Sequence, residues 1–274
     1  MKAAFSAGRN AAAAVLLALA LSACSNGHSG PSGPSWGANA SFAPGWHRLG
    51  VAVVRAAADP FTWAPAAGAA ILQAGNLDND IAAWANEKTP VFGGRRTARS
   101  ASDWLRTTSL ALYAGTGLAA PVAPGEDWLG AKAGGFAAGG AAIAATAAAT
   151  GLLKEAVGRE RPLGQDDASF PSRHAALAAV GARLSRETLR HYDLAPGARI
   201  ASDAGLAGLA LMTGWARVEA GMHHPADVLA GAAIGNFLAV LASEALLRPA
   251  QRDTVALHVH PVGEGWRVHA ALAF

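Results

Sequence analysis

The sequence predicts an all-α protein: a single helical bundle followed by a small C-terminal β-hairpin. From about Trp46 to Leu247, apolar residues recur with the period of a helix. From Val255 to Phe274 they alternate with other residues, as in strands. Of the 274 residues, 71 are Ala and 32 are Gly, so the helices carry small side chains and can pack closely.

Composition and charge exclude two broad classes of protein. With 52% hydrophobic and 15% charged residues, the chain can bury a core and is not a disordered protein. Lys2 and Arg9 lie within the first 23 residues, and the remaining chain holds 20 basic against 19 acidic residues. No long basic run remains, so we expect no nucleic-acid partner.

The first 23 residues have the composition of a secretory signal. Lys2 and Arg9 precede an apolar stretch over residues 11–21 that is too short to span a bilayer. The stretch leads into Leu21-Ser22-Ala23-Cys24, which resembles the bacterial lipobox, whose cysteine is lipidated and becomes the first mature residue. A plain signal peptide with a chance cysteine is the alternative.

Cys24 is the only cysteine, which excludes an intrachain disulfide and leaves this thiol for a lipid anchor. With Ser25 behind it, the lipobox resemblance implies an outer-membrane lipoprotein that faces the periplasm. We expect residues 24–45, rich in Gly, Ser and Pro, to form a flexible tether to a helical domain over residues 46–250. The hairpin would be an appendage over residues 251–274.

Several expected helices have recognisable ends. Ser100-x-x-Asp103 is a capping-box pattern, and Pro225 fits a first helical position. Pro162 and Pro249 are expected to end the helices that precede them. The uncharged runs are mostly Ala and Gly, which favours a soluble bundle over membrane spans, the alternative. The expected helices are 46–58, 65–75, 78–88, 101–119, 127–158, 174–192, 200–220 and 226–247.

The last stretch is expected to fold as two strands. Apolar residues alternate over 255–259 and over 266–274, on either side of Gly263-Glu264-Gly265. Two strands cannot close a barrel, and an isolated hairpin is marginal in water. We therefore expect the hairpin to pack on the bundle.

The first of three clusters with chemical potential ends the helix expected over 127–158. Lys154 and Arg161-Pro162 stand seven positions apart, so both side chains can leave one helix face with roughly 10 Å of rise between them. Two cations at this spacing could bind an anion. A basic helix end is also favoured by the helix dipole alone.

The second cluster, Pro171-Ser172-Arg173-His174, leads into an apolar helix. Ser172 could be an N-cap and no more. The free backbone N–H groups of a helix N-terminus also form an anion site, and His174 would stand beside that anion.

The third cluster contains Arg217, His223, His224 and Asp227 around a helix–turn–helix. Asp227 in a first helical turn is favoured by the dipole in any case. It could also accept from Nδ1–H of His223 and so orient that ring. A metal site built from His223, His224 and Asp227 is an alternative.

Together the clusters resemble the type 2 phosphatidic acid phosphatase superfamily, which includes bacterial class A acid phosphatases and vanadium-dependent haloperoxidases. The family pattern is Lys, six residues, Arg-Pro; then Pro-Ser-Gly-His; then Ser-Arg, five residues, His, three residues, Asp. The chain departs from it at Arg173, where the family has Gly, and at Ala216, where it has Ser.

The resemblance implies a metal-independent phosphatase without a cofactor, acting on a lipid phosphate or a small phosphomonoester and inhibited by vanadate. It implies that His223 is the nucleophile and forms a phosphohistidine, that Asp227 holds His223, and that His174 serves the leaving group. A haloperoxidase, an acid phosphatase on soluble periplasmic phosphates and an inactive envelope scaffold are alternatives. The residues implied to bind phosphate are Lys154, Arg161, Ser172, Arg173 and Arg217.

Overall fold

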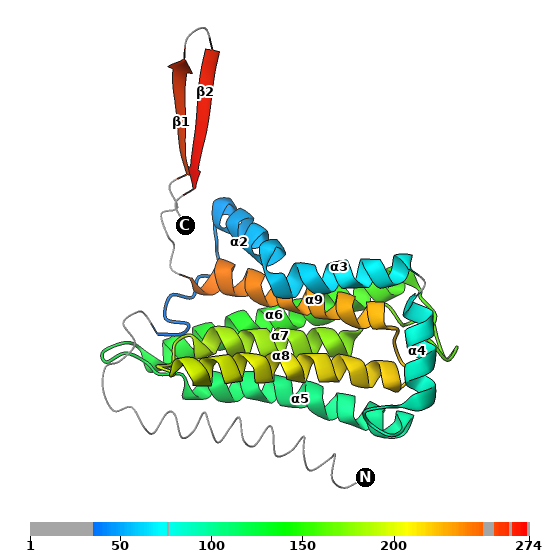
Figure 1. Ribbon diagram of the computed structural model, residues 1–274. Coiled ribbons are helices and arrows are strands. Elements are labelled where there is room, and N and C mark those ends of the chain that lie inside the picture. Colours follow the sequence, from blue (N-terminus) through cyan, green and yellow to red (C-terminus); the bar gives the residue numbers. More distant parts are fainter. Residues whose placement is uncertain (1–34, 76, 249–254, 263–264, 273–274) are drawn as a thin grey trace.

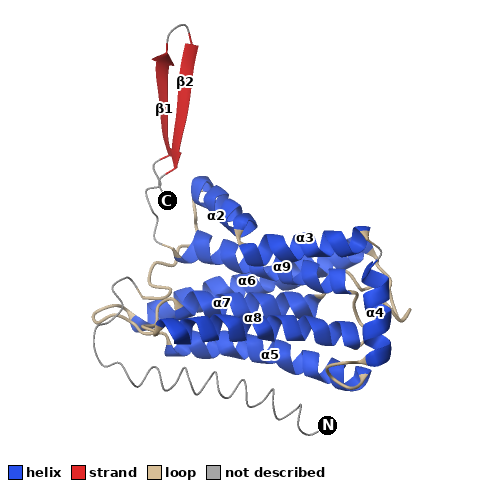
Figure 2. Ribbon diagram, viewed as in Figure 1, coloured by secondary structure: helices blue, strands red, loops and turns tan. Residues whose placement is uncertain are grey.

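The computed structural model describes residues 35–75, 77–248, 255–262 and 265–272, and its residues up to 248 are helical, as the sequence predicts (Figures 1 and 2). The helices are α2 (Trp46–Ala58), α3 (Pro60–Ala74), α4 (Leu77–Lys88), α5 (Arg95–Ala119), α6 (Trp128–Val157), α7 (Arg173–Leu189), α8 (Pro196–Glu219) and α9 (Pro225–Ala242), followed by a short π-helix, Ser243–Leu247.

Helices α5 to α9 run alongside one another as a bundle (Figure 1). Helix α7 contacts α5, α6, α8 and α9, and it holds the central position. Helix α3 covers α9, and α4 crosses one end of the bundle. The C-terminal ends of α6 and α8 therefore meet the N-terminal ends of α7 and α9 at the end that α4 covers.

Three helices begin four to six residues earlier than the sequence predicts: α3, α5 and α8, which starts at Pro196. Helix α3 begins at Pro60, because the side chain of Asp59 accepts from the backbone N–H of Phe61 and caps it. The capping box predicted at Ser100-x-x-Asp103 is wrong, since both residues lie inside α5, which starts after Gly94. The extra turns are stabilised by burial of Ala98 in the bundle.

Part of the tether predicted over residues 24–45 is packed in the structure, because residues 35–37 are buried against the bundle. Trp36 is 3% exposed and packs edge-on against Tyr113 and Phe136. A Cβ on Gly135 would come within 2.6 Å of the Trp36 ring, so this glycine makes room for the indole. The sequence pattern gave no sign of this contact, because Trp36 stands alone among Gly, Ser and Pro. Residues 1–34, with the expected signal and Cys24, lie outside the described residues.

Two glycines of α9 bring it onto the start of α7. A Cβ on Gly231 would stand 2.4 Å from the carbonyl oxygen of Ser172, and one on Gly235 would stand 2.1 Å from that of Ala176. Any side chain at these positions would push the helices apart. The glycines thus fix the start of α7 relative to the start of α9.

Two stretches are long and apolar enough to cross a membrane by length and composition: α6 and the run Pro225–Leu247. In its most apolar window α6 is 28% buried, against 56% for the second stretch. We expected the helices rich in Ala and Gly to pack on one another rather than to face lipid. The larger buried share of the second stretch fits this expectation better than that of α6 does. The preference for a soluble bundle stays a prediction.

At the C-terminus the backbone forms strands β1 (Val255–Val262) and β2 (Gly265–Leu272), paired antiparallel with Val255 opposite Leu272. Packing of this segment on the bundle stays a prediction.

Candidate active site

The three sequence clusters meet at the end of the bundle that α4 crosses. Lys154 lies in the last turn of α6, and Arg217 in the last turn of α8. Ser172 is the N-cap of α7, and Asp227 is in the first turn of α9. His223 lies between α8 and α9. Since each residue stands at a helix end, the packing of four helices sets their relative positions.

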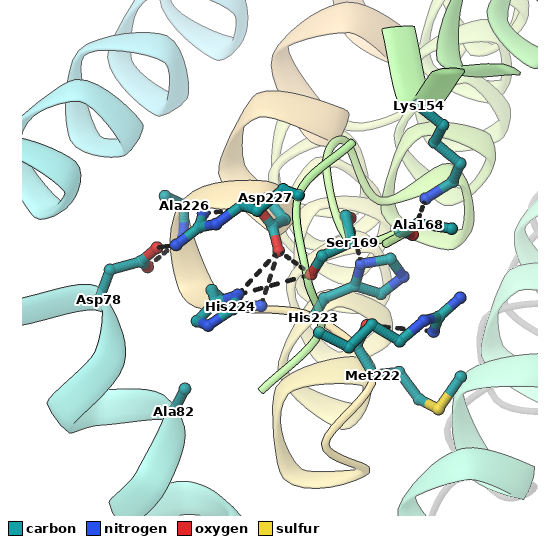
Figure 3. A network of polar contacts seen from close by, with 12 residues as sticks. Asp78, Ala82, Lys154, Ala168, Ser169, Met222, His223, His224, Ala226 and Asp227 are labelled. Atoms are coloured by element: carbon teal, nitrogen blue, oxygen red, sulfur yellow. Dashed lines mark hydrogen bonds and ion pairs between the residues drawn. The ribbon is translucent and has the colours of Figure 1, made fainter. Parts of the chain in front are cut away.

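The imidazole of His223 is oriented by a backbone carbonyl. Its Nδ1 lies 2.6 Å from the carbonyl oxygen of Ser169, which can only accept, so Nδ1 carries the proton (Figure 3). The residue is 2% exposed. Burial, followed by the charges of Arg217 and Lys154, holds the pKa of His223 well below its usual value. His223 is therefore neutral near pH 7, with an unprotonated Nε2.

Asp227 does not hold His223, which corrects the sequence prediction. Its Oδ2 accepts from the backbone N–H of His224 at 2.8 Å and from the hydroxyl of Ser169 at 2.5 Å, and lies 3.3 Å from Nδ1 of His224. The bond to the backbone N–H caps α9, and this geometry draws the carboxylate toward the helix start.

Arg159 ties Asp227 to α4. Its guanidinium donates to Oδ1 of Asp227 at 2.7 Å and to Oδ2 of Asp78 at 2.8 Å, and Asp78 also accepts from the backbone N–H of Ala226 (Figure 3). Burial alone would raise the pKa of Asp227, but the bonds from His224 and Ser169 and the charge of Arg159 bring it down to about 2. Asp227 is thus ionised and fully paired, and it fixes the turn that carries His223.

Three cations lie near enough to His223 to disfavour its protonation. Lys154 donates to the carbonyl of Ala168 at 2.5 Å, and burial, with the nearby charge of Arg161, lowers its pKa to about 8. Arg161 is held by Asp166 and by the carbonyl of Met222.

Arg217 has the least compensation of the three cations. It is 4% exposed, and it donates to the hydroxyl of Ser102 at 3.3 Å. Its Nε has no partner among the described residues, and burial lowers its pKa to about 10. A buried guanidinium with an unmatched donor is costly on its own and fits an anionic ligand.

The second cluster contributes an N-cap and backbone hydrogen bonds at the start of α7. The hydroxyl of Ser172 accepts from the backbone N–H of Ala175 at 3.5 Å, and the backbone N–H of Ser172 donates to the carbonyl of Asp227 at 2.9 Å. These bonds join the starts of α7 and α9. Arg173 is exposed at the first position of α7.

His174 faces α5, an element that the sequence motifs do not include. Its Nε2 lies 2.7 Å from Oδ1 of Asp103 and 3.3 Å from Nη1 of Arg106. Burial, then the charge of Arg217, lowers the pKa of His174 to about 4, and the bond to Asp103 opposes that effect.

Among the residues that sequence reasoning missed, Asp103 and Arg106 contact His174, Arg159 contacts Asp227, and Asp78 contacts Arg159. Arg159 stands between Lys154 and Arg161, and its place in that cluster was a usable signal. The other three come from α4 and α5, distant in sequence from the clusters.

The geometry of His223, His224 and Asp227 does not support the alternative that they form a metal site. Among residues 35–75 and 77–248, no group of three or more His, Cys, Asp or Glu side chains is arranged to hold a metal ion. Nδ1 of His223 is bound to a backbone carbonyl, and Nδ1 of His224 faces Asp227.

Comparison with known proteins gives a family match for this part of the chain. Residues 136–248, which include all three clusters, match the family model of the PAP2 superfamily. The match supports a phosphatase, that is, a phosphoric monoester hydrolase.

A solved structure with a similar trace is described as "Crystal structure of the first transmembrane PAP2 type phosphatidylglycerolphosphate phosphatase from Bacillus subtilis". The TM-score is 0.49 and the identity 19%, over 72% of this chain and 94% of that chain. A comparison with curated protein sequences gave no significant match.

Proposed function

We propose that the protein is a metal-independent phosphatase that transfers the phosphoryl group of a phosphomonoester to His223 and then to water. The observation that carries the proposal is the bond from Nδ1–H of His223 to the carbonyl of Ser169. It fixes the tautomer whose bare Nε2 can attack phosphorus, with three cations nearby.

In the first step Nε2 of His223 attacks phosphorus in line with the leaving oxygen. A nitrogen–phosphorus bond forms and the phosphorus–oxygen bond breaks. His174, in its protonated and cationic form, donates a proton to the departing alkoxide and becomes neutral. Lys154, Arg161 and Arg217 stabilise the charge that spreads over the equatorial oxygens. Ser172 and the backbone N–H groups at Arg173 complete the anion site.

In the second step His174 takes a proton from water, which attacks phosphorus as the bond to His223 breaks. Inorganic phosphate leaves and both imidazoles return to their starting forms. No metal ion or cofactor is needed in this scheme, since the cations of the chain supply the charge.

For the substrate we propose a lipid phosphate of the cell envelope. The match to the PAP2 superfamily and the two apolar helices support a substrate at a membrane. Lipidation of Cys24, in an outer-membrane lipoprotein facing the periplasm, would hold the domain at that surface. Hydrolysis of soluble periplasmic phosphates is the second candidate, because the phosphate site itself does not depend on a lipid tail.

The decisive experiment measures phosphate release by the parent and by His223→Ala from a lipid phosphate in micelles and from a soluble aryl phosphate, with acid-stable and acid-labile phosphoprotein separated. The parent should form an acid-labile phosphoenzyme, and His223→Ala should form none and lose at least about 1,000-fold in rate. His224→Ala is the matched control and should lose far less. Comparable rates in the parent and in His223→Ala would remove His223 from this role.

A further inference from the structure

Helix α5 forms a wall of the site from outside the PAP2 segment. Asp103 and Arg106, three positions apart on α5, both reach Nε2 of His174, which lies in the first turn of α7. Residues at this spacing lie on one face of a helix. The carboxylate is 2.7 Å from Nε2 and the guanidinium is 3.3 Å away.

These two contacts require different protonation states of the same atom, Nε2 of His174. The carboxylate of Asp103 only accepts, so its contact requires a proton on Nε2. The guanidinium of Arg106 only donates, so its contact requires a bare Nε2. The contact with Asp103 is shorter by 0.6 Å and is assisted by charge, so the resting state has the proton on Nε2 and leaves Nδ1 as the free nitrogen of a neutral ring.

The other positive charge that acts on His174 disfavours its protonation, as Arg106 does. Arg217 of α8 faces His174 and, after burial, does most to disfavour its cationic form. Arg173 precedes it on α7 and is exposed. Asp103 is the carboxylate in direct contact with His174, and its side chain is 53% exposed. A dianionic substrate would offset the positive charge of Arg217. Asp103 and Arg106 would then be the groups that control the protonation of His174.

We propose that Asp103 and Arg106 are positioning residues with opposite effects on His174: Asp103 stabilises the proton-bearing ring that serves the leaving group, and Arg106 opposes protonation. The proposal rests on the proposed role of His174 in phosphate transfer. It adds to the catalytic machinery two residues of α5 that lie outside the three sequence clusters.

The first measurement follows the ring of His174 by NMR in the full chain, labelled with ¹⁵N-histidine and assigned with His174→Gln. Arg106→Gln should raise the pKa of His174 by about 0.5 to 1, because an adjacent cation is lost. Adding Asp103→Asn to Arg106→Gln should lower it again by a similar amount, about 0.5 to 1. Starting from Arg106→Gln keeps the titration at higher pH, away from acid unfolding.

The second measurement is the pH profile of kcat/KM. A general acid must be protonated, so activity falls as pH rises through its pKa. Asp103→Asn should move this basic limb to lower pH, and Arg106→Gln should move it to higher pH. The position of the limb separates this effect from any loss of substrate affinity in Arg106→Gln.

The controls remove the same charges elsewhere on the surface. Glu87→Gln breaks a surface pair with Lys88, and Arg190→Gln breaks an exposed pair with Glu187. Neither should move the limb. Shifts of the same sign in both α5 variants, or shifts no larger than those of the controls, would overturn the proposal. If the parent releases no phosphate, the proposed function fails, whereas the NMR titration still tests the opposed pair.

Discussion

Ser169 contacts both His223 and Asp227, and it keeps them apart. Its carbonyl accepts from Nδ1–H of His223 at 2.6 Å, and its hydroxyl donates to Oδ2 of Asp227 at 2.5 Å. His223, the proposed nucleophile, is thus oriented by a neutral backbone group rather than by a carboxylate. Asp227 acts on the ring through its charge and through the turn that it fixes.

This arrangement predicts a moderate kinetic effect of Asp227→Asn. Where a carboxylate itself holds the catalytic imidazole, its conversion to the amide costs about 10⁴-fold in kcat. Here Ser169 would still hold the tautomer of His223, so we expect a loss of about 10- to 100-fold from the missing charge. Steady-state kinetics on an aryl phosphate decide the matter. A loss near 10⁴-fold would mean that Asp227 binds His223 during turnover.

The stability of the fold should depend on Asp227 in a manner set by pH. A carboxylate with a pKa of about 2 in the folded chain stabilises the fold at pH values above its unfolded pKa. That contribution, about 2 kcal/mol, is lost as pH falls from about 4 toward 2. The difference in free energy of unfolding between the parent and Asp227→Asn, from urea titrations, should shrink over this range. A difference that does not change with pH would contradict the expectation.

What the sequence could predict followed from local signals. The seven-residue spacing from Lys154 to Arg161 and the proline at the start of α9 are readable along the chain, and they predicted the helix ends that carry the candidate site residues. The contact between Asp103 and His174 depends on how α5 packs against α7, which no local pattern records. Trp36 was missed for a similar reason, since its partners lie about 80 to 100 positions further on.

The contact between α7 and α9 gives a stability prediction with a matched control. Gly235→Ala places a methyl group 2.1 Å from the carbonyl oxygen of Ala176, so we expect about 1–3 kcal/mol of destabilisation. The displaced start of α7 also carries His174, so activity should fall as well. Gly208→Ala on α8 meets no atom within 4 Å and should be neutral or stabilising by up to about 1 kcal/mol. Equal effects in thermal unfolding would show that helices α7 and α9 can separate at no cost.

Inhibitors should distinguish the phosphatase from a metallohydrolase. Vanadate resembles phosphate in charge and shape, so we expect it to compete with substrate for Lys154, Arg161 and Arg217. Chelation by EDTA should leave the rate unchanged. Loss of activity with EDTA that zinc or magnesium restores would instead indicate metal catalysis. Bromide oxidation by the vanadate-loaded protein with peroxide would support the haloperoxidase alternative.

The last prediction concerns membrane attachment. Residues 35–274, exported behind a signal without a lipidation site, should be recovered from the periplasm without detergent and remain active. The physical reason is that Ala and Gly, which dominate the uncharged run of α6, expose little apolar area per residue. The fragment has to keep Trp36, because a start at residue 45 would leave a cavity against Tyr113 and Phe136 and cost about 3–5 kcal/mol. Trp36→Ala in the longer fragment is the control for that loss. If the longer fragment sediments with membranes and requires detergent, α6 spans the bilayer, and the substrate then reaches Arg217 and His223 from the lipid phase.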